Sequence, residues 1–193
     1  SPFTLGVSHG AVFGAAFAIV VLNAGMSPKA PTNTGAAAAL NLTNIYSVTI
    51  FAFLGAMMAT GVILLLSTVK KLSSEAIILA GVALSSLFVS GTILLQYFGS
   101  DVEVASIVFW TFGDVGRLNW REIVITLGAA ILVTIYFVFN SWNLNALSAG
   151  DDVAGSLGVN VSTFRVVGMI MATLVTALIT AFMGVIAFLG LLA

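Results

Sequence analysis

The sequence lacks cysteine, contains one histidine and three prolines in 193 residues, and is only 7% charged. Without cysteine it can form neither a disulfide nor a thiolate metal site, and one histidine does not supply the usual zinc ligands. Soluble domains carry about 25% charged residues, so this chain is depleted in charge. Its six basic residues are scattered and form no phosphate-binding patch, which excludes nucleic acid as a partner.

The few charges are spaced so that long apolar runs lie between them. No charged residue occurs between Lys29 and Lys70, between Glu75 and Asp101, between Glu122 and Asp151, or after Arg165. About 20 apolar residues in a helix cross a hydrocarbon core of about 30 Å. A charge at mid-bilayer is costly, and each of these intervals is long enough to cross without one.

This spacing predicts an all-α, polytopic transmembrane bundle of about five membrane-spanning helices. The expected spans are 5–22, 45–69, 76–98, 123–142 and 163 to the end of the chain. A short external or re-entrant helix is expected within 101–122, and another short helix at 151–157. Basic residues are equally divided between alternate connectors, so the positive-inside rule gives no orientation.

Two sequence features concern helix packing and the membrane interface. Gly6, Gly10 and Gly14 recur every four residues, and such a small-residue stripe lets a second helix approach closely in lipid. Trp110 and Trp120 lie within the connector at 101–122 and are typical of an interfacial aromatic belt.

The third predicted span is the most polar. It carries Ser85, Ser86, Ser90 and Gln96. These hydroxyls either bond back to their own helix or across to a neighbour, which is a structural role. Alternatively, this face lines a polar path through the membrane.

The sequence contains no catalytic constellation. It has no G-x-x-x-x-G-K-[ST] phosphate loop, so it does not hydrolyse ATP by that mechanism. Asp151 and Asp152 are adjacent and diverge on a helix, so they do not form a carboxylate dyad. His9 has no partner acid in any span, and the absence of acids within the spans argues against proton or sodium coupling. We therefore predict no catalytic residue, metal or cofactor.

Five segments, in order, resemble the permeases of iron-siderophore, haem and vitamin B12 ABC importers. They are Pro2–Ala11, Leu79–Leu84, Phe109–Gly113 with Trp120, Gly150–Val159, and Gly184–Leu191. The first is similar to P-x-x-L-G-V-S-[SN]-G-A and the fourth to G-[ED]-x-x-A-x-x-L-G-[VI]. His9 replaces the usual Ser or Asn. Val185 replaces a common proline, so the last helix is expected to continue without a break there.

The resemblance implies one transmembrane permease domain over 1–193, a fragment equivalent to spans three to seven of about ten. It implies a multi-pass subunit of the inner or plasma membrane, surrounded by lipid, that forms the translocation pathway for iron-siderophore, haem or cobalamin-type chelates. The implied partners are a separate ABC ATPase subunit, a periplasmic or extracellular substrate-binding protein, and a second permease subunit in a homodimer.

The resemblance also assigns roles to residues. The expected coupling helix, which sits in the ATPase, comprises Gly150, Asp151, Asp152, Val153, Ala154, Leu157 and Gly158. Ser73 and Ser74 become candidate gate residues at the cytoplasmic end of the third span, whose Ser85, Ser86, Ser90 and Gln96 would line the pathway. This placement puts Lys70 and Lys71 inside the cell and 101–122 outside.

Two readings of a different class remain open from the sequence. A self-contained channel or secondary transporter of small solutes would give flux without ATP from the chain alone. A membrane scaffold without a transported ligand would tolerate replacement of the serine face of the third span.

Overall fold

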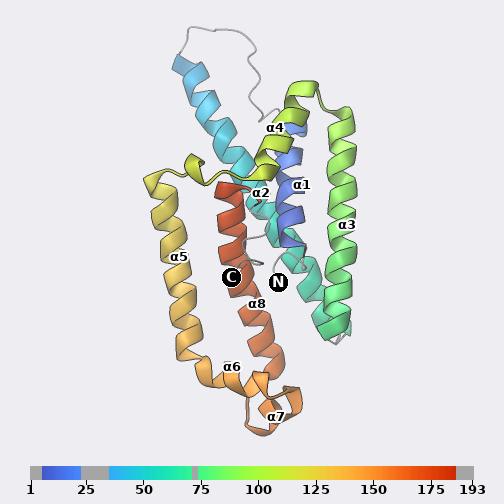
Figure 1. Ribbon diagram of the computed structural model, residues 1–193, viewed down its shortest axis with the longest axis vertical. Helices are drawn as coiled ribbons and strands as arrows, with labels where there is room; N and C mark the ends of the chain where they lie inside the picture. The colour runs from blue at the N-terminus through green and yellow to red at the C-terminus, as the bar shows by residue number, and fades with distance from the viewer. Residues whose placement is uncertain (1–5, 23–34, 71–73, 186–193) are drawn as a thin grey trace.

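A computed structural model describes residues 6–22, 35–70 and 74–185, without the side chains of 35–45, 68–70, 74, 75 and 117. Within these ranges the chain consists of helices joined by short turns and contains no strand. The helices are α1 (Val7–Val21), α2 (Gly35–Lys70), α3 (Ser74–Phe98), α4 (Asp101–Phe112), the 3-10 turn η1 (Val115–Arg117), α5 (Trp120–Phe139), α6 (Ser141–Ser148), α7 (Asp151–Ser156) and α8 (Val161–Met183) (Figure 1). The predicted fold class, a bundle of apolar helices, is confirmed.

Four of the described helices are long and apolar enough to cross a membrane. The apolar segments are Tyr46–Ser67 of α2, Ala76–Phe98 of α3, Trp120–Phe139 of α5 and Val161–Met183 of α8. The first predicted span corresponds to α1, whose 15 residues extend only about 22 Å. Alone, α1 is therefore shorter than a hydrocarbon core of about 30 Å.

Helix α1 lies at the centre of the bundle and packs against α2, α3, α4 and α8. Its buried residues are mostly small, among them Ala11, Ala15 and Ala18. Small side chains let neighbouring backbones approach closely, and close packing is a main source of helix association in lipid. The first predicted span is thus an interior helix, apolar on all sides because protein surrounds it.

Helix α4 confirms the short helix expected in the connector at 101–122. It begins with a reciprocal cap in which the Ser100 backbone N–H donates to Glu103 Oε2 at 2.7 Å. One stripe of α4 is buried, with Ile107 1% and Trp110 4% exposed. The interfacial role predicted for Trp110 is therefore wrong: its indole belongs to the core that α4 forms with α1.

The fourth predicted span is interrupted near its end. The helix α5 ends at Phe139, and Asn140 directs both its backbone N–H and its Nδ2 to the carbonyl oxygen of Tyr136, at 3.1 and 3.0 Å. A separate helix, α6, then begins at Ser141. The sequence prediction continued the span to Trp142 and missed α6, because one asparagine is a weak break signal in an apolar run.

The last helix ends earlier than predicted. The helix α8 stops at Met183, and Gly184 adopts a φ of +78° that turns the chain. The expectation of an unbroken helix at Val185 is therefore wrong. Glycine occupies this left-handed region without the steric cost that other residues pay, so Gly184 supplies the break that a proline at 185 would otherwise give.

The short connecting helices form two pairs, which lie at opposite ends of the bundle. Figure 1 shows α4 and η1 at the upper end, with α6 and α7 at the lower end, where α2 also ends and α3 begins. The helix α8 rises from α7 and ends beside α4. This arrangement places one long helix between the two connectors.

Candidate functional site

The loop helix α7 lies between the two spans α5 and α8 and has glycines on both sides. Gly150 precedes it with a φ of +115°, and Gly158 follows it with a φ of +81°. The Val159 N–H reaches back to the Ala154 carbonyl at 3.0 Å, which closes the C-terminal end. Asp151 and Asp152 occupy the first turn, where negatively charged carboxylates interact favourably with the helix dipole. The short helix expected from the sequence at 151–157 is therefore present.

An ion pair joins α7 to α8. Arg165 Nη2 lies 2.9 Å from both carboxylate oxygens of Asp151. The two residues are 14 positions apart, so the contact spans the whole turn between the helices. Sequence reasoning named Asp151 but missed Arg165, because nothing local distinguishes this arginine as its partner.

The outer face of α7 exposes apolar side chains. Val153 is 44% exposed, Leu157, which directly follows the helix, is 57% exposed, and Asp152 is also exposed. In contrast, Ala154 is fully buried, and α7 packs against α6 and α8. The helix is therefore anchored on one side and presents a mixed apolar and acidic surface on the other.

The four polar residues of α3 do not share one environment. Ser86 and Ser90 are exposed, and their hydroxyls donate to the carbonyl oxygens four residues earlier, at 3.1 and 2.8 Å. Ser85 is partly buried beside Gly6, which precedes α1, and its hydroxyl donates to the Gly81 carbonyl at 2.8 Å. Gln96 is half-buried. Only Ser86 and Ser90 thus lie clearly on an open face.

The candidate gate residues fall outside what can be described. Ser73 is not among the described residues, and the side chain of Ser74 is not described although α3 begins there. Among the described residues, no group of three histidine, cysteine, aspartate or glutamate side chains gathers in a way that could hold a metal ion.

The glycine stripe of α1 faces α2. A Cβ added to Gly10 would lie 2.5 Å from the Gly55 carbonyl oxygen, and one added to Gly14 would overlap the Phe51 carbonyl oxygen. Gly6 instead precedes α1 with a φ of +76°. Gly55 was missed in the sequence, although it belongs to a small-residue pattern with Ala52, Ala56 and Ala59 that carries the same signal.

A backbone junction joins the ends of α4 and α8. Gly113 has a φ of +64° and Gly184 a φ of +78°, and the Asp114 N–H donates to the Met183 carbonyl at 2.8 Å. A Cβ on Gly184 would overlap the Trp110 carbonyl oxygen. The junction therefore requires glycine, both for its conformation and for the close approach of the two chains.

We expect Gly184→Ala to destabilise the full-length protein by about 1–3 kcal/mol, because alanine is strained at this φ and its Cβ collides with backbone. The thermal unfolding temperature in detergent should fall measurably. The matched control is Gly128→Ala in α5, where an added Cβ meets nothing within 4 Å. Equal unfolding temperatures for Gly184→Ala and wild type would contradict this account of the junction.

A cleft of about 710 Å³ lies between α2, α5 and α8. Its walls are mainly apolar, with Ile50 and Phe53 on one side and Ile125 on another, and Arg121 and Glu122 stand at one end. No residue of α5 is buried in the described structure, so this helix does not close the cleft into a cavity. None of the residues predicted for the pathway or for coupling lines it.

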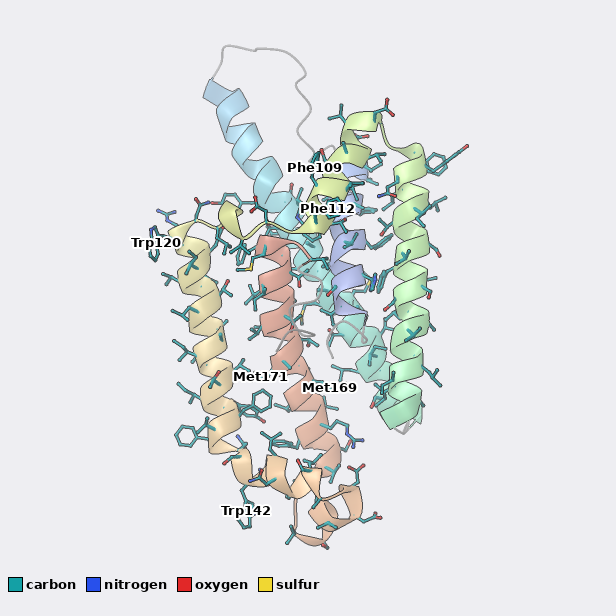
Figure 2. All side chains as sticks on the ribbon, viewed as in Figure 1. Phe109, Phe112, Trp120, Trp142, Met169 and Met171 are labelled. Carbon is teal, nitrogen blue, oxygen red and sulfur yellow. The ribbon has the colours of Figure 1, made fainter. Side chains whose placement is uncertain are left out.

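Exposed tryptophans mark both ends of the α5–α6 segment. Figure 2 shows Trp120 at the upper end of α5 and Trp142 on α6 at the lower end. They are 79% and 74% exposed. Tryptophan is enriched at both membrane–water interfaces, so this pair is typical of a helix that spans the bilayer. Trp120 occupies the kind of position predicted for it, whereas Trp142, at the opposite end, was not singled out in the sequence.

The whole chain, residues 1–193, matches the FecCD transport family. Because the match covers the full sequence, the chain belongs to this family. The membership accounts for the order of the five sequence segments and for the apolar helices. The protein is therefore a multi-pass membrane protein of a transport family.

Sequence similarity to individual proteins is consistent with this family membership. The chain is 50% identical over 192 residues to a protein named as an ABC transporter permease in Methanocaldococcus jannaschii, covering 100% of this chain and 53% of that protein. It is 26% identical to a vitamin B12 import system permease of Vibrio vulnificus, covering 98% of this chain and 52% of the relative.

A solved structure shares the fold. It is described as an inward-facing, metal-chelate type ABC transporter, and it superposes with a TM-score of 0.80 at 26% identity, covering 99% of this chain and 55% of that one. The chain thus spans about half the length of the relatives it matches.

Proposed function

We propose that this chain is the central part of the membrane-spanning subunit of an ABC importer. It would occupy a cell membrane and form part of the pathway for an iron-siderophore, haem or cobalamin-type chelate. A separate ATPase subunit would hydrolyse ATP, and a substrate-binding protein outside the membrane would deliver the chelate to a homodimer of permease subunits.

The observation that carries this proposal is the loop helix α7, in a chain of the FecCD transport family. It is short, flanked by Gly150 and Gly158, anchored on α8 and exposed on its outer face. A helix of this kind can receive a partner protein and pass its movement to the spans as a rigid body. On this proposal α7 faces the cytoplasm, and α4 and η1 lie outside.

The proposed pathway face is the exposed side of α3. It carries Ser86 and Ser90 among exposed apolar residues such as Leu87 and Leu94. No charged residue lies between Glu75 and Asp101, so the face has no charge to retain a chelate. Such a surface suits a large ligand that is contacted by shape and released easily, which supports a chelate over a small ion.

The proposal is tested with the full-length permease. Purified from its host, it should carry a bound ATPase subunit, and proteoliposomes containing both should accumulate the chelate only with ATP and the binding protein. Ferric siderophore, haem and cobalamin are assayed separately to find the substrate. Flux without ATP from the permease alone would instead support a channel or secondary transporter.

Replacing Ser86 and Ser90 together by leucine should slow uptake about tenfold, equivalent to a barrier about 1.4 kcal/mol higher. The larger leucine side chains would narrow the proposed pathway. Because both positions are exposed, the substitutions should not affect folding. Initial uptake rates in proteoliposomes give the measurement.

The control for the serine face is Ser148→Leu on α6. Ser148 is likewise exposed and donates to the carbonyl four residues earlier, at 3.1 Å. It lies at the α7 end of the molecule and away from α3, so uptake should stay unchanged. Unaffected uptake in the Ser86/Ser90 variant would remove this face from the pathway.

A further inference from the structure

Resting on the proposed function, we infer that Arg165 is a positioning residue that locks the loop helix α7 onto α8. Its contact with Asp151 makes the two helices move as one unit. The two adjacent acids of α7 then have different roles: Asp151 binds inward to α8, and Asp152 remains outward for a partner subunit.

The geometry of the pair supports a locking role. One nitrogen, Arg165 Nη2, is 2.9 Å from both Asp151 oxygens, so the carboxylate is held through both of its acceptors. Hydrogen bonds between ionised groups are shorter and stronger than neutral ones. The Arg165 side chain is 28% exposed and that of Asp151 56%, so the contact lies at the edge of the fold, where the partner would act.

The covalent joint between α7 and α8 is a short non-helical segment that contains a glycine. It consists of the four residues 157–160, and Gly158 in it adopts a φ of +81°. Asn160 caps α8 by accepting the Thr163 N–H at 3.2 Å, which fixes the start of α8 but not the direction of α7. The ion pair bridges this joint from the first residue of α7 to the second turn of α8, and so restrains that direction.

Asp152 is the natural comparison within the same turn. Consecutive residues on a helix diverge by about 100°. Among the described residues, the one ion pair is that between Arg165 and Asp151, so Asp152 forms none and its charge stays on the outer surface. The sequence prediction placed both acids in the coupling helix, and the ion pair with Arg165 distinguishes Asp151 from Asp152.

The helix α8 is suited to receive a movement of α7. It packs against α1, α2 and α5 along its length, and its far end meets α4 at the Gly113–Gly184 junction. A displacement passed through Arg165 therefore reaches the centre of the bundle and its opposite end. Exposed ion pairs add little to folding stability, so removing this one should impair coupling while the protein still folds.

The test uses the full-length permease with its ATPase and binding protein in proteoliposomes. The variants are Arg165→Gln, Arg165→Asp, and the exchange Asp151→Arg with Arg165→Asp. Chelate transported per ATP hydrolysed should fall roughly three- to tenfold in the two single variants, and the exchange should restore most of it. Arg165→Lys, which keeps one cationic nitrogen, should retain most of the coupling.

A second measurement reports how firmly α7 is held, through the mobility of a spin label attached to it. The sequence has no cysteine, so Ser156→Cys gives a unique site within these 193 residues for a nitroxide label on α7. The label should become more mobile in Arg165→Gln and return to its original mobility in the exchange variant. This readout does not require transport.

The outcomes separate the two proposals. If the wild-type permease neither binds an ATPase nor transports a chelate with ATP, the proposed function fails. If wild type transports and the single variants couple equally well, or the exchange restores neither coupling nor label mobility, the positioning role of Arg165 is wrong. Restoration of both readouts by the exchange supports it.

Discussion

Replacing Gly14 by leucine is expected to abolish assembly of the full-length protein, and Gly14→Ala to destabilise it by about 1–3 kcal/mol. The reason is steric: even a single Cβ at this position would overlap the Phe51 carbonyl oxygen of α2. Backbone cannot rotate away as a side chain can, so α1 and α2 would have to separate. Monodispersity on size-exclusion chromatography and unfolding temperature in detergent are the measurements.

The large expected effect follows from the position of this contact. Gly14 packs where α1, the central helix, crosses α2, and the rings of Phe17 and Phe51 stack beside it with centroids 5.9 Å apart. In lipid, helix association depends strongly on packing, because lipid tails are as apolar as the side chains. Losing the closest approach therefore removes a main source of stability.

The matched control is Gly61→Ala on α2. An added Cβ there meets nothing within 4 Å, and alanine is the better helix former by about 1 kcal/mol. This variant should be neutral or slightly more stable. An unfolding temperature for Gly14→Ala equal to that of Gly61→Ala would show that the close approach of α1 and α2 does not contribute as described.

The sequence predicted the elements whose signals are local. Charge spacing placed the spans, and the two aspartates between Gly150 and Gly158 placed α7 almost to the residue. Both signals lie in the sequence of the element itself or at its ends, so no knowledge of tertiary contacts was needed.

Prediction from the sequence failed where a feature depends on a contact between residues that are far apart in the chain. Trp110 was assigned to the membrane interface from its residue type, but its burial depends on the packing of α4 against α1. Arg165 could not be paired with Asp151 from spacing, since the two residues lie on different helices and are 14 residues apart, far beyond the three or four that separate neighbours on one helix. The end of α8 was misplaced because Gly184 acts through its left-handed backbone and its approach to α4.

Replacing Val153 and Leu157 together by aspartate is expected to weaken binding of the ATPase subunit about a hundredfold, which corresponds to about 2.8 kcal/mol. These two side chains, on α7 and directly after it, are 44% and 57% exposed, so the substitution is expected to affect binding more than folding. In the proposed complex they would be buried, and burying an unpaired carboxylate is costly. Co-purification of the ATPase with the tagged full-length permease gives a first measurement, and titration of the purified subunits gives the affinity.

The control for the α7 variant replaces an exposed apolar residue by aspartate at the other end of the molecule. Val115 in η1 is 60% exposed, and Val115→Asp should leave ATPase binding unchanged. The comparison with Arg165→Gln is also informative, because that variant should keep the ATPase bound while losing coupling. If Val153→Asp with Leu157→Asp binds the ATPase normally, α7 is an ordinary connector and the partner docks elsewhere. If binding is lost there but retained in Arg165→Gln, the outer face of α7 makes the contact and its inner face transmits the movement.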